Sequence, residues 1–248
     1  MRHALALAAM LCPAVLCGQV TGKWPPDSLV NTKVIPHNTP VTQVVGAMRN
    51  ITQGLGVRCP FCHVGEEGKS LETFDFPSDK KRTKLVARQM MRMVAEINSR
   101  LDTIPERPVA KVEVTCRTCH RGISRPIPLY QLVQETATSA GVDSATRAYR
   151  ALRDRYLGRD AYDFGESSLN IAAFRLAREG KKYDDALALL QLNEGFFPGS
   201  SGMSVFRGNI LLMKGDTSGA AGAYRQAIQR DSTNGEARGR LKDIGLKP

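Results

Sequence analysis

Aromatic side chains are scarce in this sequence. Only 6% of its residues are Phe, Trp or Tyr, and there is a single Trp. Large aromatic side chains normally supply much of the apolar area that a protein core buries. A chain of 248 residues is long enough for one large domain or two smaller ones. Because aromatic residues are few, a bound group that adds apolar surface would stabilise its core.

Long apolar runs are also lacking, except at the N-terminus. Residues 4–16 form an apolar run that follows Arg2 and His3 and is too short to span a bilayer. Residues 1–18 are therefore predicted to be an export signal, with the remaining chain soluble in the periplasm or otherwise outside the cytoplasm. A retained anchor that faces the periplasm is the alternative.

Cysteines are few, and their positions divide them into two groups. Cys12 and Cys17 lie within the predicted signal and would be removed with it. Lipid attachment at Cys17 is a further alternative, but lipoprotein signals require a small residue where this chain has Leu16. Membrane association is thus expected only if the signal is retained or lipidated.

Acidic residues are too few to balance the basic ones. The chain has 35 Lys and Arg against 24 Asp and Glu, a formal charge of +11. Basic proteins often bind nucleic acid, but the Lys and Arg residues here form no stripe interleaved with aromatic residues, so no nucleic-acid partner is predicted. Just over half of the excess lies in residues 19–135, which favours a bound anionic group there.

Two short motifs carry the strongest functional signal, Cys59–His63 and Cys116–His120. Each reads C-x-x-C-H, the attachment signature of c-type haem. Two thiols three residues apart can form thioethers with the two vinyl groups on one porphyrin edge, and the following imidazole then lies under the ring. The predicted cofactors are two haem c groups, whose propionates would offset the basic charge. The covalent attachment residues are Cys59, Cys62, Cys116 and Cys119, and the iron ligands are His63 and His120.

Other chemistries can use paired cysteines. A four-cysteine zinc site is one alternative, but more than fifty residues separate the pairs, and zinc does not explain a His after each pair. Two disulfides or a thioredoxin-like redox pair are further alternatives in an oxidising compartment. No strand-helix-strand pattern surrounds either pair, which disfavours them.

A six-coordinate haem iron needs a second axial ligand, Met or His. His37 lies in an extended, Pro-containing lead-in and is expected to be a surface residue. Met48 lies on the apolar face of a helix that begins at Thr39-Pro40, directly before the first motif. Met48 is therefore the candidate ligand at the first haem.

The second motif also follows a predicted helix, which Ser78-Asp79 would cap and which would run to about Leu101. Met90 and Met93 share its apolar face, whereas Met91 points away from that face. Met93 is the preferred ligand of the second haem, and Met90 is the alternative.

These residues resemble the cytochrome subunit of the photosynthetic reaction centre and its shorter two-haem relatives. The likeness covers roughly residues 33–128. The residues that carry it are Met48-Arg49, Leu55-Gly56-Val57-Arg58-Cys59 through His63, Arg92-Met93-Val94, Ile97-Asn98, and Val114-Thr115-Cys116 through Gly122. The resemblance implies a helix along each haem, whose Met ligates the iron opposite the motif His. The implied pairs are Met48 with His63 and Met93 with His120. The photosynthetic subunit has four such motifs, whereas this chain has two.

The C-terminal part has a different character. A period of 34 residues, in which Ala186 recurs as Ala220, predicts tetratricopeptide-like repeats at about 167–200 and 201–234. Helices near 143–157 and 235–244 are expected to cap these repeats. The predicted fold is therefore mainly α, with a two-haem cytochrome domain at 19–135 and a helical-repeat domain at 136–248.

The predicted function is single-electron transfer outside the cytoplasm, without enzymatic turnover. With His and Met on both irons, no coordination position remains for a substrate. A haem enzyme such as a peroxidase and a zinc-binding or repeat-mediated interaction protein are the alternatives. The expected partners are redox proteins, together with a protein or peptide ligand on the repeat domain.

Overall fold

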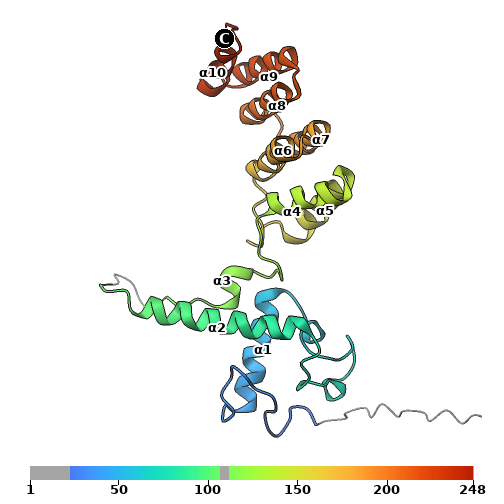
Figure 1. The fold of residues 1–248 in the computed structure, drawn as a ribbon, viewed down its shortest axis with the longest axis vertical. Coiled ribbons are helices and arrows are strands. Elements are labelled where there is room, and N and C mark those ends of the chain that lie inside the picture. Colours follow the sequence, from blue (N-terminus) through green and yellow to red (C-terminus); the bar gives the residue numbers. More distant parts are fainter. Residues whose placement is uncertain (1–22, 107–111, 248) are drawn as a thin grey trace, which may run out of the picture. The chain divides into compact units, whose positions relative to one another are not determined.

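The computed structural model describes residues 23–106 and 112–247, and these residues are mainly helical (Figure 1). The chain divides into two compact units, Met1–Gly122 and Ile123–Pro248. The predicted export signal lies outside the described residues. Among the residues described, no helix is long and apolar enough to cross a membrane.

The first unit contains three α-helices and two short 3-10 turns among its described residues. They are α1 (Val41–Leu55), η1 (Cys59–Phe61), η2 (Leu71–Thr73), α2 (Arg82–Asp102) and α3 (Cys116–His120). Pro40 sits at the N-cap of α1, close to the predicted start, because its fixed φ suits a helix entry. Gly56 ends the helix in the left-handed conformation, with φ of 64°.

The start of α2 differs from the prediction. The helix begins at Arg82, and the capping role expected for Ser78-Asp79 is not observed. The Asp79 carboxylate is instead paired with the side chains of Lys84 and Arg88, one and two turns into the helix. Two cations outcompete the backbone N–H groups for this carboxylate, so the chain enters the helix three residues later.

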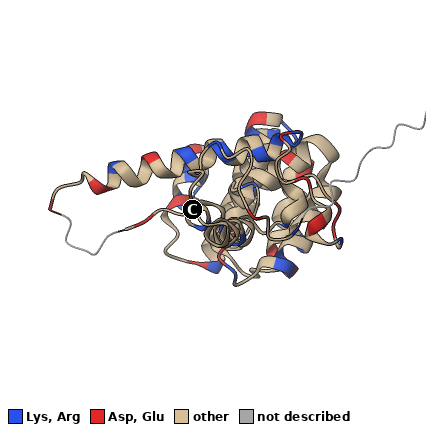
Figure 2. Cartoon of the chain, turned by 90° about the horizontal axis from the view of Figure 1, so that it is seen from below, with Lys and Arg blue, Asp and Glu red and all other residues tan. Residues whose placement is uncertain are grey.

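Helix α2 carries many of the basic residues of the first unit. Its first half contains Arg82, Lys84, Arg88 and Arg92 and no acidic residue, whereas Glu96 and Asp102 lie in its second half (Figure 2 colours both kinds of charge). The absence of a nucleic-acid partner stays a prediction from the sequence.

The second unit contains seven α-helices among its described residues. They are α4 (Leu129–Ala140), α5 (Val142–Tyr156), α6 (Glu166–Gly180), α7 (Tyr183–Glu194), α8 (Ser201–Lys214), α9 (Thr217–Arg230) and α10 (Gly235–Asp243). Helices α6 with α7 and α8 with α9 pack as pairs joined by two-residue turns. The pairs overlap the ranges predicted for the two repeats, and Ala186 and Ala220 are both fully buried. Their assignment as tetratricopeptide-like repeats stays a prediction.

The division between the units lies earlier than the predicted domain boundary. Residue 135 falls inside α4, a helix that the sequence analysis did not assign. Leu129, Val133 and Ala137 on α4 are buried in the core of the second unit, together with Tyr149. The helix therefore belongs to the second unit, and the link between the units lies near Gly122.

Candidate cofactor site

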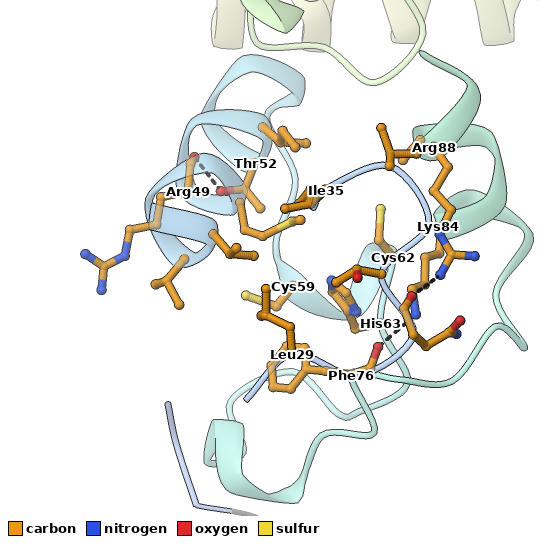
Figure 3. Close-up of a pocket in the computed structure, with 18 of the residues that line it drawn as sticks. Leu29, Ile35, Arg49, Thr52, Cys59, Cys62, His63, Phe76, Lys84 and Arg88 are labelled. Carbon is orange, nitrogen blue, oxygen red and sulfur yellow. Dashed lines mark hydrogen bonds between the residues drawn. The ribbon is translucent and has the colours of Figure 1, made fainter. Parts of the chain in front are cut away.

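The first C-x-x-C-H motif lines a cavity of about 250 Å³ in the first unit (Figure 3). One wall is the apolar side of α1, and another is the lead-in chain at Leu29 and Ile35. The α1 residues in the wall are Val41, Val44, Val45, Met48, Arg49, Ile51 and Thr52. This volume lies just below the range of about 300–1,000 Å³ for ligand pockets. A porphyrin would fill such a cavity and extend through its mouth.

A tight backbone turn brings the three motif side chains to this cavity. Arg58 is extended, and η1 follows at once. The carbonyl of Cys59 accepts hydrogen bonds from the N–H groups of Cys62, at 3.2 Å, and His63, at 3.0 Å. Cys59, Cys62 and His63 consequently all line the same cavity.

The His63 imidazole is suited to bind a metal. Its Nδ1 is buried and has no hydrogen-bond partner. Burial lowers the pKa of His63 from its usual value, and the charge of Lys84 lowers it further. The imidazole is thereby kept neutral, the form in which histidine ligates metals. An orphaned buried nitrogen beside two thiols fits a haem bound through this motif.

The two thiols of the first motif are not in a disulfide, and neither are Cys116 and Cys119 of the second. Burial raises the pKa of Cys62, which keeps this thiol protonated near neutral pH. In the part of the chain that the structure describes, no three His, Cys, Asp or Glu side chains gather into a metal site of their own. The cysteine pairs thus do not converge in the way a four-cysteine zinc site requires.

The charged residues that line this cavity are all cationic. They are Lys33, Arg49, Arg58, Lys84 and Arg88. Arg58 is exposed and lies 3.3 Å from Glu67. No Asp or Glu belongs to the lining. A cavity with an apolar interior and a cationic edge suits a large apolar group that carries carboxylates.

Lys84 and Arg88 also connect the segments that surround the cavity. The Lys84 ammonium donates hydrogen bonds to the carbonyls of Phe76, Pro77 and Ser78, at 2.8, 3.0 and 2.8 Å. Arg88, one turn further along α2, donates to the Asn31 carbonyl at 2.9 Å and to the Asp79 carboxylate. These bonds fasten the lead-in and the 76–79 loop to α2.

The Asp79 carboxylate is held in its ionised form by the same contacts. The hydrogen bond from Arg88 is the main reason that its pKa lies well below the usual range, and Asn31 and Lys84 add to the effect. The Asp79 charge offsets part of the positive charge of Lys84 and Arg88. The residues that line the cavity still carry a net positive charge.

Two methionines line the cavity, one from each long helix. Met48 lies on α1, as expected. Met91 lies on α2 and was expected only to point away from the apolar face of its helix. Lys84, Arg88 and Met91 are four and three residues apart, so they lie on the same side of α2. Met91 therefore reaches the cavity that Lys84 and Arg88 also line. The helical spacing of Met91 from these two basic residues was the sequence pattern that could have indicated its place in the first cavity.

The second motif forms the short helix α3. Thr115 caps it, and in this capping box the Thr115 N–H donates a hydrogen bond to Thr118 Oγ1, at 3.0 Å. The Asn98 side chain on α2 makes two hydrogen bonds with the backbone of Val114, at 2.9 and 2.8 Å. The chain that leads into the second motif is thus fastened to α2.

Met90 and Met93 lie on a solvent-exposed face of α2, opposite the side that lines the first cavity. Their exposed fractions are 38% and 45%, and Leu85 and Val86 are similarly exposed at 44% and 46%. Met90 and Met93 were expected to share an apolar face of this helix, and both are accessible to solvent. Ligation of the second iron by Met93 or Met90 therefore stays a prediction.

Residues 66–152 match the family of the photosynthetic reaction centre cytochrome C subunit. The matched region contains Cys116–His120 and the methionines of α2, whereas Met48 and the first motif precede it. It continues into α4 and α5 of the second unit. This match suggests a haem-based electron-transfer role for the region around the second motif.

Proposed function

We propose that the chain is an exported electron carrier that binds two covalently attached haem c groups. The observation that carries the proposal is the first cavity, where Met48 faces the same space as Cys59, Cys62 and His63. Cys59 and Cys62 would attach one haem, and His63 and Met48 would ligate its iron.

The second haem is supported by the apolar face of α2. Exposed Val86, Met90 and Met93 form a stripe of apolar side chains on a helix that is tied to the second motif through Asn98. A stripe of this kind is unfavourable in water unless something covers it. A haem attached at Cys116 and Cys119 would cover it and would receive a sulfur ligand from Met93, or from Met90 as the alternative.

When bound, haem supplies an iron that cycles between the ferric and ferrous states. The role of the chain is to hold that iron and set its potential. His63 and Met48 would ligate one iron, and His120 and Met93 the other, which would leave no coordination position for a substrate. Thioether ligation favours the reduced state and raises the potential relative to two imidazoles. Val41, Val44 and Val45 of α1 line the cavity and would help to keep water from a group bound there.

Export and partners are part of the same proposal. The N-terminal pattern in residues 1–18 supports delivery to the periplasm or another compartment outside the cytoplasm, where c-type haem proteins act. Redox proteins are the proposed donor and acceptor, and the paired helices α6 to α9 are a candidate tetratricopeptide surface for a protein or peptide ligand.

The number of covalent haems tests the proposal directly. The full chain, matured in a host able to attach c-type haem, should contain two haems in a pyridine haemochrome assay, with an intact mass to match. Replacing Cys59 and Cys62 with Ala should remove one haem, because the attachment thiols are lost. Replacing Cys116 and Cys119 should remove the other.

An uncoloured protein with free thiols or bound zinc at these cysteines would overturn the proposal. The full chain could instead contain a single haem. If the haem content then stays the same when one cysteine pair is replaced, that pair is not an attachment site.

A further inference from the structure

The second motif rests directly on the C-terminal end of α1. The N–H of Gly122, which follows the motif, donates a hydrogen bond of 2.8 Å to the carbonyl of Gly54 in α1. Gly54 is buried. Two segments more than sixty residues apart in sequence are therefore joined by their backbones.

Glycine is required for this approach. A Cβ atom on Gly54 would lie 3.1 Å from the backbone nitrogen of Arg117 and 3.3 Å from Cβ of Cys116. A Cβ atom on Gly56 would lie 2.0 Å from the carbonyl oxygen of Gly122, closer than van der Waals contact allows. Gly56 also has φ of 64°, a conformation that disfavours a side chain.

The helix that makes this contact also lines the first cavity. Met48 precedes Gly54 by six residues, about 9 Å along an α-helix. A hydrogen-bonded helix is stiff over this length. Because no side chain separates α1 from α3, a displacement of α3 cannot be absorbed by a change of rotamer.

We propose that Gly54 and Gly56 are positioning residues that set the second haem-attachment motif at a fixed place relative to the first cavity. The inference rests on the proposed function, because it concerns the geometry between two haem sites. Close backbone contact would keep the separation and mutual orientation of the two irons constant. Electron exchange between them depends on both.

Three variants of the full chain test the proposal. Gly56→Ala forces the backbones apart, and Gly54→Ala is a milder version that keeps helical geometry. Gly46→Ala is the matched control, since Gly46 also lies in α1 but has open space around its Cβ position. Two readouts apply: hydrogen exchange of the Gly122 amide, and the magnetic interaction of the two ferric haems in electron paramagnetic resonance.

In Gly56→Ala and Gly54→Ala, the Gly122 amide should exchange at least tenfold faster, and the magnetic interaction should change. Gly46→Ala should leave both unchanged. If Gly56→Ala yields no folded protein, the result for Gly54→Ala alone tests the proposal. Unaltered magnetic interaction in a folded Gly54→Ala or Gly56→Ala protein, or equal effects of Gly46→Ala, would overturn the proposal.

The exchange measurement separates this inference from the proposed function. Protection of the Gly122 amide requires only the contact with Gly54 and can be measured without haem. A chain that lacks haem but shows the expected exchange would overturn the proposed function and leave the backbone junction in place. A chain with two haems and an unprotected Gly122 amide would overturn the inference alone.

Discussion

Met91 illustrates how strongly the role of a single residue depends on its neighbours. Met90, Met91 and Met93 are nearly adjacent in sequence, yet Met91 lines the first cavity while the other two lie on the exposed face of α2. Successive residues on a helix point about 100° apart, so adjacent methionines can serve different sites. The three thioethers are thus chemically alike but do not occupy equivalent positions in the fold.

Met93→Ala should convert one of the two haems to a high-spin state with a lowered potential. Removing the thioether leaves that iron with the imidazole of His120 alone and withdraws a ligand that favours the reduced state. Visible absorption and a redox titration of the full chain measure both effects. The other haem should keep its spectrum.

Met91→Leu is the control for this prediction, because it removes a neighbouring sulfur while conserving side-chain volume. Both haems should remain low-spin in this variant. If Met93→Ala leaves both haems low-spin and Met90→Ala does not, Met90 is the ligand of the second iron.

At the scale of the elements, the helix pairs of the second unit depend on close contacts between small and large side chains. Gly208 on α8 faces the ring of Tyr224 on α9, and a Cβ atom at Gly208 would lie 2.4 Å from that ring. Tyr224 is fully buried, and its hydroxyl donates a 2.8 Å hydrogen bond to Asn209. The ring therefore has little freedom to move away.

Gly208→Ala should lower the free energy of unfolding of the second unit by about 1–3 kcal/mol, the usual cost of overpacking a core. Urea unfolding of the full chain, followed by far-ultraviolet circular dichroism, measures the change. Gly222→Ala on α9 is the matched control, since nothing lies within 4 Å of its added Cβ. This control should be neutral or stabilising by up to about 1 kcal/mol, from improved helix propensity.

An equal loss of stability in both variants would contradict the packing argument. It would show that alanine is unfavourable at these helices for a reason unrelated to Tyr224.

At the scale of the whole molecule, all candidate haem residues belong to the first unit. The two motifs, Met48 and the methionines of α2 all precede Gly122, where the division between the units falls. The second unit contains none of these candidate residues, and aromatic residues such as Tyr149 and Phe164 pack in its core. Both hydrophobic core clusters of the described residues lie in the second unit, and the two units have separate proposed tasks.

A chain that ends at Gly122 should therefore still acquire two haems and keep the visible spectrum of the full chain. Haemochrome analysis and absorption spectra of the two proteins, matured in the same host, make the comparison. Ending the chain at residue 139 is a less suitable variant, because it would expose the buried face of α4 at Leu129 and Val133. Loss of haem from the shorter chain would show that the second unit contributes to the haem sites.

Much of the local structure was predictable from short-range patterns. The helix start at Thr39-Pro40, the helix pairs at the two repeats and the position of both motifs depend on neighbouring residues, which the sequence displays directly. The start of α2 was not predictable in this way, because Asp79 pairs with Lys84 and Arg88 in place of capping the helix. The sequence alone does not rank such competing partners.

The sequence by itself determined the two C-x-x-C-H motifs and hence the proposed attachment chemistry, since thiol spacing and the adjacent imidazole are properties of five consecutive residues. Only the tertiary structure decided which distant residues share a site. It brought Met91 to the first cavity, assigned α4 to the second unit, and joined Gly54 to Gly122. Each of these depends on how separate elements pack, and packing is a property of the folded chain that local patterns do not encode.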